Sequence, residues 1–124
     1  MQPIDISGAK DRLAAWGGYE MVHRSPGLEL GVYVLVAPEP DGQQPHADDE
    51  VYVVLEGSGA LEVDGEQAEL REGHAVFVPA GADHRFVGYE RLSVLVIFDR
   101  ASGAEEASSL PTPGPGDSDG GDIY

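Results

Sequence analysis

The chain has 124 residues, with 7 Lys and Arg against 23 Asp and Glu and no cysteine, so its formal net charge is −16. This length favours a single domain, and the lack of cysteine excludes disulfides, thiolate-ligated metals and thiolate nucleophiles. Nucleic-acid affinity depends on Lys and Arg that replace condensed counterions, so the acidic charge argues against a nucleic-acid partner. The same charge disfavours anionic membrane surfaces and attracts divalent cations.

The first 27 residues are expected to form a short helix and a lead-in strand. A helix is predicted over 7–16, with Ser7 as its N-cap and Gly17-Gly18 as its terminator. The start of the chain lacks the basic and apolar segments of a signal peptide, and no apolar run reaches the roughly 18 residues that a membrane span needs. We therefore expect a cytoplasmic protein with no membrane partner.

From Leu28 onward the apolar residues alternate with a period of two, and Gly and Pro turns interrupt them. Strands are predicted at 28–36, 51–55, 60–63, 66–70, 75–78, 85–87 and 92–98. Asp64-Gly65 suits a type I′ hairpin turn, which sets Leu61 opposite Ala68 and Glu62 opposite Gln67. Because no crossover helices separate the strands, the pattern indicates an antiparallel sandwich or barrel.

The last segment, residues 101–124, has a different composition. It carries five acidic residues, three prolines and five glycines, with no Lys or Arg. Such a segment buries too little apolar surface to offset its ordering entropy, so a flexible acidic tail is expected. The alternative is a lid or strap that docks through Ile123 and Tyr124.

Polar residues interrupt the strand pattern just before residue 51. On one face of an extended segment, the period of two collects Gln44, His46, Asp48, Glu50, Tyr52 and Val54. A buried carboxylate needs a cation or a proton, and His84, which follows the turn at 79–81, can add a third ligand. Two histidines and one carboxylate suit iron(II), manganese, zinc, nickel or cobalt.

Two motifs resemble those of the cupin superfamily. They are Gln44-x-His46-x3-Glu50-x6-Gly57 and Gly73-x5-Pro79-x-Gly81-x2-His84, and the resemblance covers residues 28–98. It implies an all-β double-stranded β-helix, a small jelly-roll barrel over 28–100 that holds one metal and assembles as a homodimer. By position, the resemblance implies that the metal ligands are Gln44, His46, Glu50 and His84. Gln44 replaces the usual first histidine and Gly88 the usual asparagine.

The resemblance favours a metal-dependent enzyme that acts on a small organic molecule in the barrel mouth. Iron(II) and a non-haem dioxygenase, an oxidoreductase, are favoured, with Glu50 and Tyr52 as catalytic residues and Asp48, Tyr52 and Phe86 bordering the substrate. One alternative is a metal-dependent isomerase, lyase or cyclase. Another is a non-catalytic small-molecule or sugar-binding barrel, in which His46 and Glu50 hydrogen-bond each other without a metal.

The other polar and aromatic residues have plainer interpretations. His74 is expected to be structural, and His23 is expected on the surface near a turn. Asp48 and Asp49 are expected in a solvated loop at the barrel mouth, although Asp48 has the parity to point inward. Phe77 is expected to fill the core. The glycines at 57 and 59 are turn residues, because no helix or Lys-Ser/Thr pair follows as in a phosphate loop.

Overall fold

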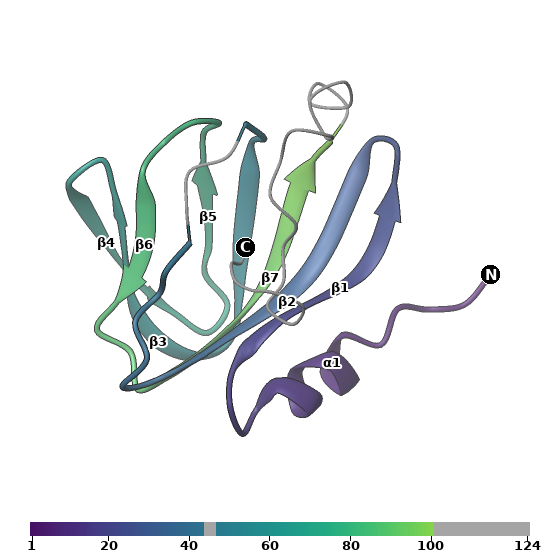
Figure 1. Cartoon of the computed structure of the whole chain (residues 1–124), viewed down its shortest axis with the longest axis horizontal. Coiled ribbons are helices and arrows are strands. Elements are labelled where there is room, and N and C mark those ends of the chain that lie inside the picture. The colour runs from purple at the N-terminus through teal and green to yellow at the C-terminus, as the bar shows by residue number, and fades with distance from the viewer. Residues whose placement is uncertain (44–46, 101–124) are drawn as a thin grey trace.

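The computed structural model describes residues 1–43 and 47–100, so the expectations for Gln44, His46 and the acidic tail lie outside the described residues. Its elements are α1 (Ile6–Leu13), β1 (Gly18–Ser25), β2 (Leu28–Val36), β3 (Glu50–Val63), β4 (Glu66–Arg71), β5 (Ala75–Val78), β6 (His84–Val87) and β7 (Arg91–Asp99). Figure 1 shows the strands curving around a common interior, with the single helix outside. The predicted all-β barrel with one short N-terminal helix is confirmed. No described helix is long and apolar enough to cross a membrane.

The long strand β3 belongs to two antiparallel layers. Its first part pairs with β5 and β7, which continues the order β1-β2-β7-β3, and its second part pairs with β4 and β6. Two separate strands at 51–55 and 60–63 were predicted, and that division is wrong. The register shifts between Val54 and Glu56, and Gly57 has φ +88°. A bulge here bends the strand without ending it.

Gly57 makes this bend possible because of both its conformation and its position. A Cβ atom at Gly57 would lie 2.1 Å from the carbonyl oxygen of Arg91 on the neighbouring β7. Its positive φ is also costly for any residue with a side chain. The glycine predicted as a turn residue therefore serves as the bend of a continuous strand.

The hairpin between β3 and β4 forms as predicted. Asp64 has φ 49° and Gly65 has φ 87°, as a type I′ turn requires. Leu61 pairs with Ala68, and Glu62 pairs with Gln67.

The N-terminal helix begins and ends earlier than predicted. Its N-cap is Asp5 rather than Ser7, because the Asp5 carboxylate accepts a hydrogen bond from the Gly8 backbone nitrogen at 2.9 Å. The helix ends at Leu13, whose carbonyl accepts from the Gly17 nitrogen at 2.8 Å. Its Ala9 is buried against Val32 and Val34, so α1 covers part of the outer face of β2.

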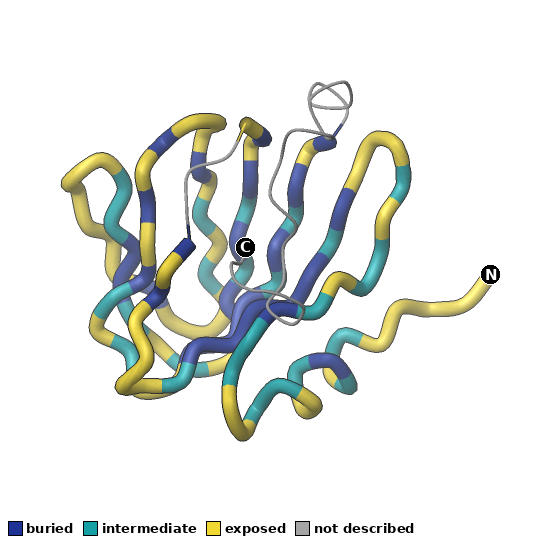
Figure 2. The backbone as a smooth tube through the Cα atoms, in the orientation of Figure 1, coloured by how far each residue is buried: buried dark blue, intermediate teal, exposed yellow. Residues whose placement is uncertain are grey.

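The main core lies inside the barrel, as the dark blue segments of Figure 2 show along successive strands. On β5, Val78 is fully buried and Val76 packs against the core, whereas Phe77 is 57% exposed. The prediction that Phe77 fills the core is therefore wrong. Neighbouring side chains on a strand point to opposite faces, and the two valines occupy the inner one.

Candidate functional site

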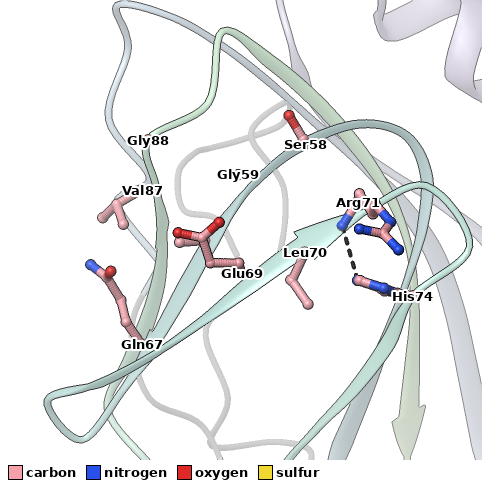
Figure 3. A pocket seen from close by; sticks show the side chains of 10 residues that line it. Ser58, Gly59, Gln67, Glu69, Leu70, Arg71, His74, Val87 and Gly88 are labelled. Atoms are coloured by element: carbon pink, nitrogen blue, oxygen red, sulfur yellow. Dashed lines mark hydrogen bonds between the residues drawn. The ribbon is translucent and has the colours of Figure 1, made fainter.

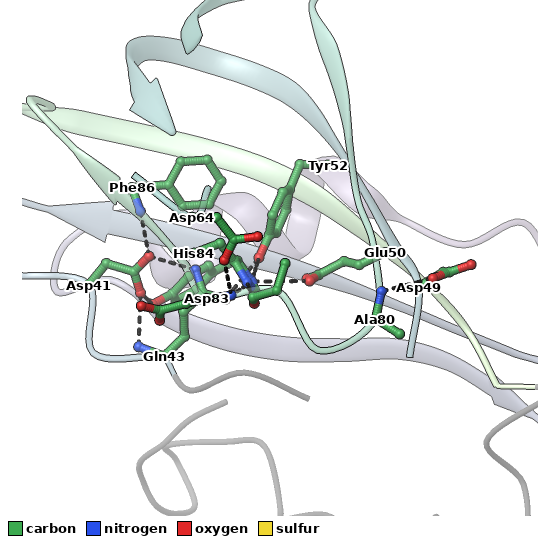
Figure 4. Close-up of polar contacts among 12 residues, drawn as sticks. Asp41, Gln43, Asp49, Glu50, Tyr52, Asp64, Ala80, Asp83, His84 and Phe86 are labelled. Carbon is green, nitrogen blue, oxygen red and sulfur yellow. Dashed lines mark hydrogen bonds and ion pairs between the residues drawn. The ribbon is translucent and has the colours of Figure 1, made fainter. Parts of the chain in front are cut away.

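Four polar side chains from three parts of the chain meet in the barrel interior (Figure 4). The Nε2 atom of His84 lies 3.1 Å from Gln43 Oε1, 3.1 Å from Tyr52 OH and 3.3 Å from Glu50 Oε1. Tyr52 donates a hydrogen bond to Gln43 Oε1 at 2.8 Å. All four residues are buried, and Tyr52 is not exposed at all.

Strand pairing brings these residues together. Glu50 and Tyr52 start the inner face of β3, where Glu50 pairs with Val78 at the end of β5. The chain then turns through 79–82 and enters β6 at His84, which pairs with the far end of β3. Sequence reasoning placed Glu50, Tyr52, His84 and Phe86 at one site, and the structure gathers these four side chains.

The His84 ring has a fixed orientation. Its Nδ1 lies 2.8 Å from the carbonyl oxygen of Ala82, and a carbonyl oxygen can only accept, so Nδ1 carries a hydrogen. Nε2 therefore faces the site, as it does in metal-binding histidines whose other nitrogen donates to a carbonyl. This contact selects the atom of His84 that is available for chemistry.

The site is rich in hydrogen-bond acceptors. If His84 is neutral, its Nε2 lone pair faces both Gln43 Oε1 and Glu50 Oε1. These three atoms attract one another only through a positive charge, which is either a proton on Nε2 or a metal ion among them. Imidazole nitrogen with carboxylate and amide oxygens is a donor set that divalent transition metals accept. The donor types of Gln43, Glu50 and His84 are therefore ones that such a metal accepts.

The metal site is not complete within the described residues. Among residues 1–43 and 47–100, no three His, Asp or Glu side chains gather closely enough to hold a metal ion. The described pair is Glu50 and His84, whereas the two other predicted ligands, Gln44 and His46, lie outside the described residues. Their assignment as ligands stays a prediction.

The environment shifts the proton affinities of His84 and Tyr52. Burial lowers the pKa of His84, but the contacts with Glu50 and the Ala82 carbonyl outweigh burial, so the pKa is raised from its ordinary value. Burial, followed by the charge of Glu50, raises the pKa of Tyr52 well above its ordinary value. The phenol of Tyr52 therefore keeps its proton at neutral pH.

Asp41 and Gln43 are site residues that sequence reasoning missed. The Asp41 carboxylate accepts from Tyr33 OH at 2.6 Å, Gln43 Nε2 at 2.6 Å and the Phe86 nitrogen at 2.8 Å. These bonds direct the amide oxygen of Gln43 toward His84 and Tyr52. The period of two was followed from residue 44 onward, and no sequence signal indicated that 41 and 43 are also buried.

The remaining predicted pocket residues differ in placement. The Phe86 ring packs edge-on against Tyr52, with ring centroids 4.7 Å apart. Asp48 is only 1% exposed and accepts from Arg100 Nη1 at 3.0 Å. The expectation of a solvated Asp48 is therefore wrong, because Arg100 compensates its burial. Asp49 is exposed and accepts from the Ala80 nitrogen at 2.9 Å.

Two pockets show which surfaces are accessible. One, of about 490 Å³, includes Gln43 and His84 in its lining and thus reaches the edge of the site. The other, of about 480 Å³, lies over β3, β4 and β6 (Figure 3). Here His74 Nδ1 accepts from the Arg71 nitrogen at 3.1 Å, which is a structural contact. His23 is partly buried in β1, 3.3 Å from the Ser25 hydroxyl.

The curved antiparallel strands around a polar and apolar interior place the protein in the class of small jelly-roll β-barrels. The family model for the cupin domain matches residues 32–98. The chain belongs to the cupin family.

The chain is also similar to three known proteins. An uncharacterised protein of Streptomyces coelicolor is 42% identical over 89 residues, which cover 71% of this chain and 85% of that protein. The dimethylsulfoniopropionate lyase DddW of Ruegeria pomeroyi is 41% identical over 58 residues, or 46% of this chain and 38% of the lyase. A crystal structure from Thermus thermophilus superposes with a TM-score of 0.62 at 29% identity, covering 80% of this chain and 97% of that one.

Proposed function

We propose that the protein is a metal-dependent cupin enzyme that transfers protons on a small organic substrate inside the barrel, as a lyase or an isomerase. The observation that carries this proposal is the approach of Tyr52 OH, Glu50 Oε1 and Gln43 Oε1 to within 3.3 Å of His84 Nε2. A protonated phenol and a carboxylate so close together supply an acid and a base for the same substrate.

The metal would be held by Glu50 and His84, together with His46 from outside the described residues. A bound divalent ion such as iron(II), manganese, zinc, nickel or cobalt would act as a Lewis acid on a substrate oxygen. Gln43 supports the same region with its amide oxygen, which Asp41 holds in place. Gln44, the residue predicted from the motif, remains a candidate ligand.

The side chains of the site take separate roles in this proposal. Glu50, a ligand in the resting site, would leave the metal to accept a proton from a substrate carbon; its carboxylate lies inside the barrel beside His84. Tyr52 donates its proton to the oxygen or leaving group, because its hydroxyl lies 3.1 Å from His84 Nε2, beside the region where the substrate would bind. Phe86 packs against Tyr52 and limits the rotation of the phenol. Gln43 accepts the hydrogen bond that orients the Tyr52 hydroxyl.

The resemblance to a lyase supports this reaction class. The alignment with the dimethylsulfoniopropionate lyase spans 58 residues, less than half of either chain, so the substrate of that lyase is not assigned to this protein. A lyase reaction needs a base that removes a carbon-bound proton and an acid or metal that stabilises the developing charge. Glu50 would be the base and Tyr52 the acid.

A non-haem dioxygenase is the second candidate. The observation that favours it is the chemical nature of the donors at the site: the chain has no cysteine thiolate, and the site offers imidazole nitrogen with carboxylate and amide oxygens, as iron(II) oxygenases use. This reaction would need dioxygen as co-substrate, which gives a direct distinction between the two candidates.

Both candidate functions require a bound transition metal, and the metal content of the purified protein tests this requirement. Protein purified without chelator is expected to carry close to one equivalent of a transition metal by elemental analysis. His84→Ala should lose most of it, whereas the matched variant His23→Ala, which changes a histidine outside the site, should retain it. Less than about a tenth of an equivalent in the unmodified protein would refute the metal-dependent enzyme.

Turnover with and without air separates the reaction classes. A panel of hydroxy acids, enediols, sugar acids and dimethylsulfoniopropionate is incubated with the metal-loaded protein. Product in both atmospheres supports the lyase or isomerase, and product with oxygen consumption only in air supports the dioxygenase. Ligands that raise the melting temperature without forming product in either atmosphere would instead indicate a binding protein.

A further inference from the structure

A second buried polar cluster lies beside the proposed catalytic group and consists of Tyr19, Glu29, Asp48 and Arg100. Tyr19 OH donates to Glu29 Oε2 at 2.8 Å, and Arg100 Nη1 donates to Asp48 Oδ2 at 3.0 Å. The same Nη1 lies 3.7 Å from Glu29 Oε1, so both carboxylates flank one guanidinium. Glu29 and Asp48 are each 1% exposed.

Strand register connects this cluster to the catalytic group. On β7, Phe98 pairs with Glu29 on one side and with Glu50 on the other. Because adjacent strands lie about 4.8 Å apart, the backbones at Glu29 and Glu50 are about 10 Å from each other. Glu29 shares its face of β2 with Tyr33 and Leu35, which belong to the main core, so its side chain points into the same interior.

The carboxylates of Glu29 and Asp48 each have one buried oxygen that no described residue donates a hydrogen bond to. These oxygens are Glu29 Oε1 and Asp48 Oδ1. Arg100 donates to the other oxygen of Asp48, and Arg24 Nε lies 3.8 Å from Glu29 Oε1, beyond hydrogen-bond distance. A buried acceptor without a donor is unfavourable, so both oxygens are suited to a ligand that donates.

The charges in the interior exclude an anionic ligand group at this place. All seven Lys and Arg of the sequence lie within the described residues, and Arg100 is the buried one among them. Among the described residues, four carboxylate side chains are buried, those of Glu29, Asp41, Asp48 and Glu50. Arg100 is already engaged by two of them, and the nearby Arg24 faces Glu29, so a phosphate or carboxylate would meet cations that carboxylates already compensate.

We infer that Glu29 Oε1 and Asp48 Oδ1 form a subsite that binds the protonated amine of the ligand. An ammonium group offers N–H donors to both oxygens and adds a positive charge where carboxylates predominate. The apolar part of the ligand then lies along the core side chains toward Glu50. In this respect the subsite rests on the proposed function, since Glu29 lies two strands from Glu50 on the same inner face.

Three probes of equal chain length test the subsite: butylamine, 1-butanol and butyrate. Their dissociation constants for the full chain are measured by NMR titration, without turnover, so the result does not depend on catalysis. Butylamine is expected to bind at least about tenfold more tightly than 1-butanol, since it adds charge-assisted hydrogen bonds, and butyrate is expected to bind most weakly. Equal binding of butylamine and 1-butanol, or tighter binding of butyrate, would overturn the inference.

Isosteric variants locate the effect. Glu29→Gln and Asp48→Asn should each reduce the preference for butylamine over 1-butanol at least threefold, and Glu66→Gln, at the exposed start of β4, should not change it. A preference that survives in both variants would overturn the subsite. If a variant does not fold, an NMR titration of the unmodified protein tests the location of the subsite. Butylamine should then shift the side-chain resonances of Arg100 and the ring resonances of Tyr19, and unshifted resonances at saturation would overturn the subsite.

Discussion

Gln43 Nε2 donates to Asp41 Oδ2 over 2.6 Å, and this hydrogen bond decides which atom of Gln43 faces His84. In a side-chain amide the nitrogen donates hydrogen bonds and the oxygen accepts them. With the donor end held by a carboxylate, the acceptor end is directed toward Tyr52 OH and His84 Nε2. Asp41 thus influences His84 and Tyr52 through Gln43.

Replacing Asp41 tests this influence. Asp41→Asn keeps the shape but replaces an acceptor with a donor, which conflicts with the donors from Gln43, Tyr33 and the Phe86 nitrogen. We expect metal affinity to fall about 10- to 100-fold, as it does when residues that orient metal ligands are changed. Chelator competition measures the affinity. Tyr33→Phe removes one donor only and should have a smaller effect, so an equal loss in both variants would contradict the role of Gln43.

The hydroxyl of Tyr52 is the proposed proton donor. Tyr52→Phe retains the ring contact with Phe86 and removes only the oxygen. On a substrate found in the panel, we expect kcat to fall about 10²- to 10⁴-fold, with a smaller change in KM. Tyr89→Phe is the control, because the Tyr89 hydroxyl donates to the Glu39 carbonyl outside the catalytic group. Full activity in Tyr52→Phe would remove Tyr52 from the mechanism.

Tyr89 makes stability depend on pH in the alkaline range. Burial, followed by the charges of Asp41 and Glu39, raises the pKa of Tyr89 to about 12. A tyrosine in the unfolded chain ionises near pH 10. The unfolded state therefore loses its proton first, so this contribution to stability is complete below about pH 10 and is lost as the pH rises through 12. Urea unfolding at a series of alkaline pH values should show a shallower decline in Tyr89→Phe, and identical slopes would contradict the assignment.

The exposed Phe77 tests the expected homodimer. Phe77 pairs with Val51, which pairs with Ile97, which pairs with Leu30, so an apolar row crosses the outer face of four strands. If two copies meet there, Phe77→Gln should convert the dimer to a monomer in sedimentation experiments. The monomeric variant should still fold, as circular dichroism can check, since Phe77 is exposed within one chain and lies outside its core. Trp16→Gln, which changes another exposed aromatic residue, should leave the assembly unchanged.

The strand pattern of this chain was largely predictable from local information. β2 and β5 have the predicted bounds, and the Asp64-Gly65 turn sets the predicted register. These features depend on neighbours in sequence, namely the period of two and the residues that tolerate positive φ. Glu50, Tyr52, His84 and Phe86 were named for the same reason, because their parity and the two motifs were both visible in the sequence.

The errors arise where the outcome depends on partners distant in the chain. Whether β3 ends or bends at Gly57 depends on the Arg91 carbonyl beside it. Asp48 was expected in solvent, but Arg100, 52 positions later, provides the charge that allows its burial. In the same way Asp41 and Gln43 become site residues only because β6 brings the Phe86 nitrogen to them.

The sequence alone determined the alternation of the strands, the hairpin turn, the acidic charge and the absence of thiolate ligands, because each follows from residue type and spacing. Only the tertiary structure decided which polar groups are buried together, such as the pairing of Glu29 and Asp48 around Arg100. The physical reason is that a charge can be buried only beside its compensating partner, and the fold, not the spacing in sequence, brings the partner to it.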